Sequence, residues 1–145
     1  MKSVEKMRYQ PNSTSSKYVI LTIIMNVIFL FYALNVLDYN IFLGIKVLAN
    51  IFLTLYLFLA MEKVKAYSIR YSISLIVIGI LAIFREFYVP LKMIKEKTEP
   101  KDKIIIMMVL LLFVSVSMII SGVIGYKKAK LLTSYLKEKG NNHDK

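Results

Sequence analysis

Long apolar runs constrain this chain more than any other feature of its sequence. Residues 18–37, 41–61 and 104–126 each form a block of 20 or more predominantly apolar residues. At about 1.5 Å of rise per residue, a helix of that length crosses the roughly 30 Å hydrocarbon core of a bilayer. A β-barrel would need short segments that alternate apolar and polar residues, which these continuous runs are not. The pattern predicts an all-α integral membrane protein.

A fourth apolar block is interrupted, and its length decides how it is interpreted. The uncharged part, residues 71–84, has 14 residues and would reach only about 21 Å as a helix, which is too short to cross. Extending the block to residue 91 takes in Arg85, Glu86 and Pro90 and gives a sufficient length. We therefore expect a fourth span over 71–91, and an antiparallel bundle of four transmembrane helices with short loops.

Positive charge lies between the apolar blocks. The chain has 145 residues and a formal net charge of +11; residues 1–17 carry +3, 62–70 carry +2, 92–103 carry +2 and 127–145 carry +4. Basic loops of this kind are typical of segments that meet anionic lipid headgroups. A nucleic-acid-binding protein would instead present a folded basic face with interleaved aromatic side chains, so no nucleic-acid partner is expected.

The basic segments also predict an orientation. Short cytoplasmic flanks of membrane proteins contain an excess of Lys and Arg. With both termini in the cytoplasm, 13 Lys and Arg residues lie inside and 5 lie outside, all five of them in residues 92–103. The Ile- and Lys-rich composition indicates an AT-rich prokaryotic genome. We therefore expect a multi-pass protein of a prokaryotic plasma membrane, with its N-terminus and C-terminus inside.

The two ends of the chain are polar and flank the predicted transmembrane domain of residues 18–126. Residues 1–17 are predicted to be a flexible basic N-terminal arm, and residues 127–145 a basic juxtamembrane C-terminal tail. Four apolar residues recur in this tail at helical spacing among lysines. They are Leu131, Leu132, Tyr135 and Leu136. A basic amphipathic C-terminal helix is expected, which either lies at the lipid surface or extends into solvent.

Three charged residues lie inside the predicted spans. Each needs a partner or a route to water, because a charge at the centre of a transmembrane helix costs about 2.5–3.5 kcal/mol on insertion scales. Lys46 and Glu86 each lie five residues from the outer end of their spans, and Arg85 lies six residues in. Equal depth in antiparallel helices allows a Lys46–Glu86 ion pair. Asp38, in the outer turn, is a candidate partner for Arg85.

Small and polar residues at helical spacing predict which helix faces meet, since such residues permit close approach and interhelical hydrogen bonds. Each predicted span carries one such stripe. The stripes are Thr22, Asn26 and Ala33; Lys46, Asn50 and Thr54; Gly79, Ala82 and Glu86; and Ser117, Ser121 and Gly125. We expect all four stripes to face the bundle interior and Asn26 to make an interhelical hydrogen bond.

One group of residues is the candidate binding site. We call Lys46, Asn50, Arg85 and Glu86, with Asp38 beside them, the intramembrane polar cluster. The chain has no cysteine, and its single histidine, in the C-terminal tail, offers no cluster of imidazole ligands. No metal, cofactor or catalytic residue is predicted, because the lone intramembrane acid has only cations near it and a catalytic site needs more.

Two functions fit these observations. The first is a small accessory or interaction protein that docks a membrane-protein partner or anionic lipid through its helices and its basic inner surface. The second is an oligomeric small transporter or channel that uses Lys46, Arg85 and Glu86. A transport site is expected near the bilayer midplane, whereas these charges lie in the outer leaflet, so the first function is favoured.

Overall fold

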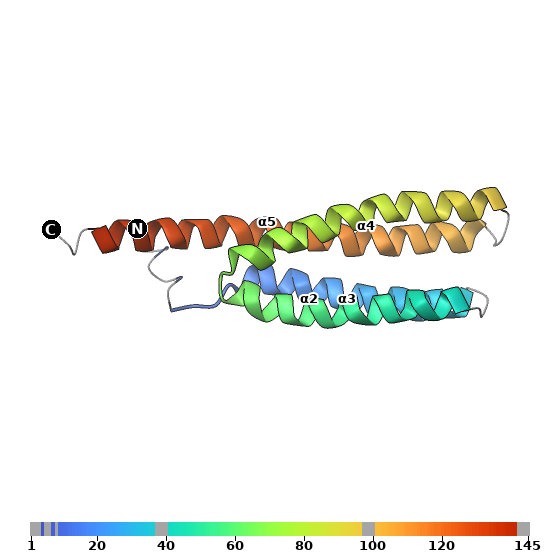
Figure 1. Cartoon of the computed structure of the whole chain (residues 1–145), viewed down its shortest axis with the longest axis horizontal. Helices are drawn as coiled ribbons and strands as arrows, with labels where there is room; N and C mark the ends of the chain where they lie inside the picture. The colour runs from blue at the N-terminus through green and yellow to red at the C-terminus, as the bar shows by residue number, and fades with distance from the viewer. Residues whose placement is uncertain (1–3, 5–6, 8, 37–40, 97–100, 142–145) are drawn as a thin grey trace.

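The described part of the chain consists of long helices and contains no strand. A computed structural model describes residues 4, 7, 9–36, 41–96 and 101–141, without the side chains of 36, 41–43, 85–87, 89–96 and 140–141. Its helices are α2 (Ser13–Val36), α3 (Ile41–Lys65), α4 (Ile69–Glu96) and α5 (Lys101–Asn141) (Figure 1). The prediction of an all-α chain built on four long helices is confirmed.

Helix α5 is the centre of the packing. It contacts α2 and α4 extensively, whereas α2 also packs on α3, and α3 touches α4 only lightly. Figure 1 shows successive helices running in opposite directions, with α2 beside α3 and α4 beside α5. The α5 helix extends past the other three at the end of the bundle where the N-terminus lies. The chain is therefore an antiparallel bundle in which one helix is much longer than its neighbours.

Two apolar clusters fill the bundle. The larger cluster takes side chains from all four helices and includes the fully buried Leu57, Leu75 and Met118. The smaller cluster joins α2 to α5 alone, through residues that include Phe29 and Leu111. The contact between α2 and α5 therefore continues beyond the region in which all four helices meet.

Several helices are long and apolar enough to cross a membrane. Among the described residues, three segments qualify: Ser13–Asn35, Gly44–Lys65 and Lys101–Lys139. In α4 the apolar part with described side chains is shorter and covers Ile69–Phe84. The chain thus contains three candidate membrane-spanning helices and a fourth helix whose apolar part is shorter.

Helix α2 begins earlier than the sequence predicts. It starts at Ser13, so residues 13–17, which were assigned to a flexible arm, form its first turns. Asn12 is the N-cap: its Oδ1 accepts a hydrogen bond from the backbone N–H of Ser15 at 3.4 Å. The backbone N–H of Asn12 also donates to the carbonyl oxygen of Lys65 at 3.1 Å, which ties the start of α2 to the end of α3.

The expected basic C-terminal helix is the continuation of α5. This helix runs without a break from Lys101 to Asn141. Residues 126–139 contain no Gly or Pro and are rich in Lys and Leu, which are favourable in helices, so nothing in the sequence ends the helix after Tyr126. A straight helix that follows the bundle axis cannot also lie flat against the end of the bundle. Of the two expectations for this tail, extension past the bundle is the one observed (Figure 1).

The connection between α3 and α4 is a short turn that a tyrosine stabilises. Tyr67 adopts a left-handed conformation with φ of 56°, and the backbone N–H groups of Tyr67 and Ser68 donate to the carbonyl oxygens of Val64 and Lys63. This is the Schellman arrangement, in which glycine usually occupies the left-handed position. The Tyr67 hydroxyl donates to the carbonyl oxygen of Gln10 at 3.0 Å. Burial raises the pKa of Tyr67, so its phenol keeps the proton it donates.

Candidate functional site

Amide and hydroxyl side chains join α2 to α3 in the bundle interior. Asn26 Nδ2 donates to Asn50 Oδ1 at 2.8 Å and to Thr54 Oγ1 at 3.0 Å. Asn50 Nδ2 lies 3.5 Å from Asn26 Oδ1, and the Thr54 hydroxyl donates to the carbonyl oxygen of Asn50 at 2.9 Å. Both asparagines are buried. The expected interhelical hydrogen bond of Asn26 is confirmed, and we call Asn26, Asn50 and Thr54 the amide cluster.

Pairs of hydroxyl side chains join α2 to α5. The hydroxyl oxygens of Ser15 and Ser121 lie 2.9 Å apart, and each hydroxyl lies within 2.9 Å of the other residue's backbone carbonyl oxygen. The hydroxyl oxygens of Thr22 and Ser117 lie 2.8 Å apart. All four residues are buried. These pairs fix the register of α2 against α5 by short-range hydrogen bonds.

Glycines allow α4 and α5 to approach closely. A Cβ atom on Gly122 would lie 2.7 Å from the backbone oxygen of Ser72, and one on Gly79 would lie 3.2 Å from that of Ser115. Gly125 faces a point where several helices meet, because a Cβ there would lie 2.6 Å from Ser72 Oγ and 3.1 Å from Ser15 Oγ. The backbones of the two helices are therefore in near contact, as small-residue faces permit in membrane helices.

The light contact between α3 and α4 rests on aromatic and hydroxyl groups. The Tyr56 hydroxyl is hydrogen-bonded to Ser74 Oγ, and the Tyr56 ring stacks on Tyr71 with 6.3 Å between ring centroids. Both contacts lie close to the turn that connects the two helices. Polar pairs thus join each helix to at least one neighbour on the described part of the bundle.

The intramembrane polar cluster is brought together only in part. Asn50 lies inside the bundle, where its partner is Asn26 on α2 and not a residue of α4. The side chains of Arg85 and Glu86 lie outside the described residues, as does Asp38. The expected ion pair between Lys46 and Glu86 therefore stays a prediction.

Lys46 does not lie on the interior face that was expected for it. Its side chain is exposed, whereas Asn50 is buried and Thr54 half-buried. Residues spaced by four rotate by about 40° per step around a helix, so a stripe of three such residues drifts by about 80°. Among the described side chains in the first half of α3, only Asn50 is buried, and Lys46 lies outside that narrow strip.

The other predicted interior stripes lie as expected where their side chains are described. Thr22, Asn26 and Ala33 are buried on α2, and Ser117, Ser121 and Gly125 are buried on α5. On α4, Gly79 is buried and Ala82 is half-buried. The helical periodicity of small and polar residues therefore identified the packing faces of three helices.

One polar junction was missed at the end of the bundle. Asn12 Oδ1 accepts a hydrogen bond from Lys128 Nζ at 3.1 Å, and the same ammonium group donates to Thr14 Oγ1 at 3.1 Å. We call Asn12, Thr14, Lys65 and Lys128 the Asn12 junction, because α2, α3 and α5 meet there. Its signal was present in the sequence: an Asn followed by Ser and Thr before an apolar run is a typical helix start.

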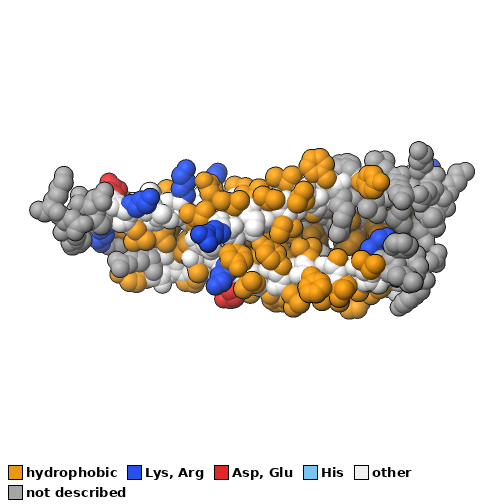
Figure 2. Space-filling view, viewed as in Figure 1, with side chains coloured by type: hydrophobic (Ala, Val, Ile, Leu, Met, Phe, Trp, Pro, Cys, Tyr) orange, Lys and Arg blue, Asp and Glu red, His pale blue; other side chains and the backbone are white. Residues whose placement is uncertain are grey.

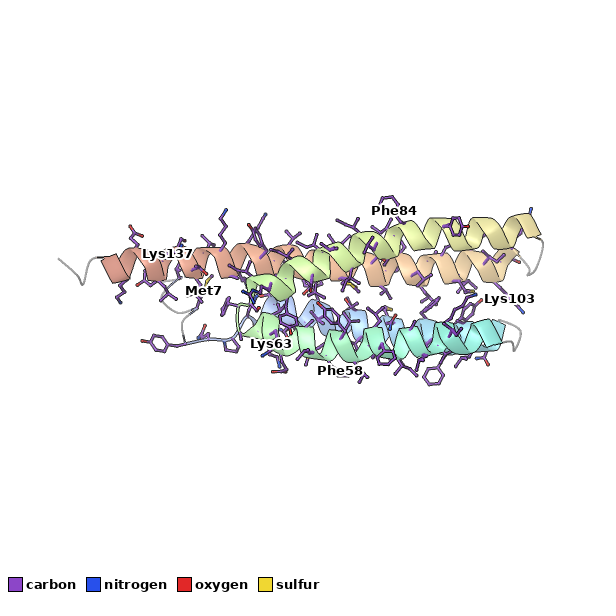
Figure 3. The ribbon with its side chains drawn as sticks, viewed as in Figure 1. Met7, Phe58, Lys63, Phe84, Lys103 and Lys137 are labelled. Carbon is purple, nitrogen blue, oxygen red and sulfur yellow. The ribbon has the colours of Figure 1, made fainter. Side chains whose placement is uncertain are left out.

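Cationic side chains gather at the same end of the bundle. They are Lys17, Lys63, Lys65, Arg70, Lys127, Lys128, Lys130, Lys137 and Lys139. Figure 2 shows most of the visible Lys and Arg side chains toward this end, with apolar side chains over the middle of the molecule. In Figure 3, Lys63 and Lys137 lie toward the end where α5 extends, and Lys103 lies at the opposite end.

The chemistry of the interior is that of neutral hydrogen-bonding groups. The buried polar residues with described side chains are Asn, Ser and Thr, all of which lack a titratable side chain. No group of three His, Asp or Glu side chains that could hold a metal ion occurs among the described residues. Such an interior can fix helix register, and its described groups offer no acid or base for catalysis.

Comparison of the chain with protein-family models, with curated proteins and with solved structures gives no match. By its fold, the described part of the chain is an all-helical bundle with three candidate membrane-spanning helices.

Proposed function

We propose that this chain is a multi-pass membrane protein that crosses a prokaryotic plasma membrane four times. The support is the outward-facing apolar surface. Phe31, Phe52, Phe84 and Phe113, one on each helix, are all more than half exposed. Water-soluble monomers rarely expose continuous apolar surface of this extent, whereas a lipid-facing belt requires it.

The fourth crossing is proposed for α4 because of its length. The helix has 28 residues, which corresponds to about 42 Å and exceeds the roughly 30 Å hydrocarbon core. Its described apolar part, Ile69–Phe84, would cover about 24 Å, or about four-fifths of that core from the inner side. Arg85 and Glu86 would then lie in the outer leaflet, where long side chains reach the headgroups at a reduced cost.

The orientation we propose places both termini in the cytoplasm. The cationic end of the bundle collects the N-terminal segment, the turn between α3 and α4, and the C-terminal part of α5. An excess of Lys and Arg in short flanking segments marks the cytoplasmic side.

Cysteine labelling tests this orientation directly. The natural chain has no cysteine, so Thr133→Cys and Lys101→Cys each introduce a single reactive thiol. We expect a membrane-impermeant maleimide added to intact cells to label Lys101→Cys and to leave Thr133→Cys unlabelled until the cells are opened. Labelling of Thr133→Cys alone in intact cells would reverse the proposed orientation.

The role we propose is that of an accessory protein that docks an acidic protein partner through the end of α5. We call residues 127–141 the α5 extension. One observation supports this role: these residues continue α5 for about 22 Å past Tyr126, whereas the headgroup layer is only about 5–7 Å thick. Most of the α5 extension would therefore stand in water, beyond the reach of lipid headgroups.

The exposed surface of the α5 extension suggests the chemistry of the partner. Six exposed residues share one helix face, which we call the docking face. They are Lys127, Lys130, Leu131, Ser134, Lys137 and Glu138. Three lysines against one glutamate leave the face net basic. A basic face with an exposed leucine complements an acidic surface with an apolar patch, and two copies of the same basic face would repel each other. A different, acidic protein is therefore the favoured occupant over a second copy of this chain.

A transporter or channel that uses Lys46, Arg85 and Glu86 has less support. Lys46 is exposed, and the polar groups at the described core of the bundle are occupied by one another in the amide cluster and the hydroxyl pairs. A transport path needs groups near the midplane that are free to exchange partners. We therefore keep docking as the proposed function.

Site-specific photo-crosslinking in native membranes tests the docking face. A photoreactive residue at Ser134 should give a protein adduct, and the same residue at Phe113 in the apolar belt should give none of that size. The double variant Lys130→Glu/Lys137→Glu should lower the adduct yield by about tenfold or more, because like charges across an interface cost several kcal/mol.

The matched control is charge reversal at the other end of the bundle. Lys101→Glu also replaces an exposed lysine on α5 and should leave the Ser134 adduct at its natural yield. An adduct yield that falls equally in Lys101→Glu and in the double variant, or that stays unchanged in the double variant, would contradict an acidic partner on the docking face.

A further inference from the structure

The Asn12 junction holds a buried donor that no described atom satisfies. Asn12 is 1% exposed, and its Nδ2 has no hydrogen-bond partner. The oxygen of the Asn12 side chain fixes the orientation of the amide, since Oδ1 accepts hydrogen bonds from the Ser15 backbone N–H and from Lys128 Nζ. Exchanging the oxygen and nitrogen would turn the amide N–H groups toward two donors. Nδ2 therefore needs an acceptor from outside the described residues.

The surroundings of Nδ2 favour an acceptor with negative charge. Oδ1 and Nδ2 belong to one amide group, so Lys128 Nζ, which lies 3.1 Å from Oδ1, is close to Nδ2 as well. The junction also lies at the N-terminus of α2, where the helix dipole is positive. Helix N-termini with a nearby cation bind phosphate-like anions. Water could accept from Nδ2, but an oxyanion would also neutralise Lys128.

The junction lies at the depth of phospholipid phosphates if the bundle is embedded as proposed. Asn12 precedes Tyr18 by six residues, or about 9 Å of chain, and Lys128 follows Tyr126 by two residues, or about 3 Å. Because the two residues are in contact, these estimates bracket the outer part of the headgroup layer, which is about 5–7 Å thick. Tyr18 and Tyr126 are half-buried residues of the kind that mark the edge of the hydrocarbon core. The headgroup layer begins at that edge, so a lipid phosphate can meet the junction without leaving the membrane plane.

We propose that the Asn12 junction binds a phosphate group, with Asn12 Nδ2 and Lys128 Nζ as donors. The phosphate is that of an anionic phospholipid headgroup or a free phosphate ion, and the depth of the junction favours the headgroup. This inference rests on the membrane embedding proposed above and is independent of the acidic partner at the docking face. The phosphate supplies Asn12 Nδ2 with an acceptor that the described residues do not provide.

Two variants separate phosphate binding from folding. Asn12→Asp keeps the N-cap acceptor and places a second oxygen, with negative charge, where Nδ2 stands. It should fold at least as well as the natural chain, since the carboxylate pairs with Lys128 and the α2 dipole, and it should reject phosphate. Lys128→Gln removes the cation, and Lys63→Gln, which replaces an exposed lysine of α3 at the same end of the bundle, is the matched control.

The experiment measures thermal unfolding of the full chain in two settings. In lipid nanodiscs, phosphatidylglycerol is compared with phosphatidylcholine; in detergent, inorganic phosphate is compared with chloride at equal ionic strength. We expect phosphatidylglycerol to raise the unfolding midpoint of the natural chain and of Lys63→Gln. The apparent affinity for phosphatidylglycerol should fall by about fivefold or more in Lys128→Gln and Asn12→Asp, because each variant loses a hydrogen-bond donor to the phosphate.

The outcomes identify the source of the phosphate. Stabilisation by phosphatidylglycerol alone assigns the site to a lipid headgroup, and stabilisation by inorganic phosphate in detergent assigns it to a free ion. Equal responses of Asn12→Asp and the natural chain, or an equal loss of affinity in Lys63→Gln, would overturn the proposal. A chain that does not enter nanodiscs would instead contradict the membrane embedding, so the two failures are distinguishable.

Discussion

Replacing Gly122 with alanine is expected to destabilise the bundle by about 1–3 kcal/mol, the usual cost of overpacking a well-packed contact. The new Cβ would lie 2.6 Å from Ile76 Cγ1 and 2.7 Å from the backbone oxygen of Ser72. The backbone oxygen belongs to α4 and cannot rotate away, so α4 and α5 have to separate. The measurement is the unfolding free energy of the purified chain in detergent micelles.

Gly44 provides the matched control for this substitution. A Cβ at Gly44 meets nothing within 4 Å, and the residue lies within α3. Gly44→Ala should therefore stabilise the chain by about 0.5–1 kcal/mol, because alanine loses less backbone entropy than glycine in a helix. If Gly122→Ala gave the same stabilisation as Gly44→Ala, the close contact between α4 and α5 would be wrong.

Removing Asn26 is expected to have the second large effect. In Asn26→Ala, the buried amide of Asn50 loses its partner on α2. Leaving a buried polar group unsatisfied costs about 1–3 kcal/mol. In a double-mutant cycle, Asn26→Ala and Asn50→Ala should be less damaging together than their separate losses predict. The interaction energy should be about 0.6–1.7 kcal/mol, the range measured for hydrogen bonds between membrane helices.

Lys46 is the control for the cycle. It lies four residues before Asn50 on the same helix, but its side chain is exposed. Lys46→Ala should change the unfolding free energy by less than about 0.5 kcal/mol and should add independently to Asn26→Ala. Strict additivity of Asn26→Ala and Asn50→Ala would show that the amide cluster does not couple α2 to α3.

The helical fold and most of the packing faces were predictable from the sequence. Apolar runs of sufficient length specify helices, and small or polar residues at helical spacing mark the side on which a neighbour can approach. Thr22, Asn26, Ser117 and Ser121 were identified in this way and are buried. The spacing could not reveal which helix each stripe would face, since that depends on the order of the helices around the bundle. Asn50 therefore pairs with α2 and not with α4.

The polar ends were less predictable than the apolar middle. Hydropathy places the start of a helix where the apolar residues begin, but Asn12 caps α2 six residues before Tyr18. Ser15 was assigned to a flexible arm, although its hydroxyl pairs with Ser121 across the bundle. The candidate site was built on charged residues, and only Asn50 of that cluster has a described interhelical partner. Helical spacing failed at Lys46, which is exposed although it shares its predicted stripe with Asn50 and Thr54.

The central place of α5 has a consequence for how the chain assembles during synthesis. Translation delivers α2, α3 and α4 before α5, yet α5 is the main packing partner of both α2 and α4. Until the last helix arrives, α2 and α3 can form a hairpin, while α4 touches its predecessor only lightly. The final third of the polypeptide thus completes the assembly of everything made before it. A ribosome that stops short of α5 would release helices whose glycine- and serine-lined faces lack their packing partner.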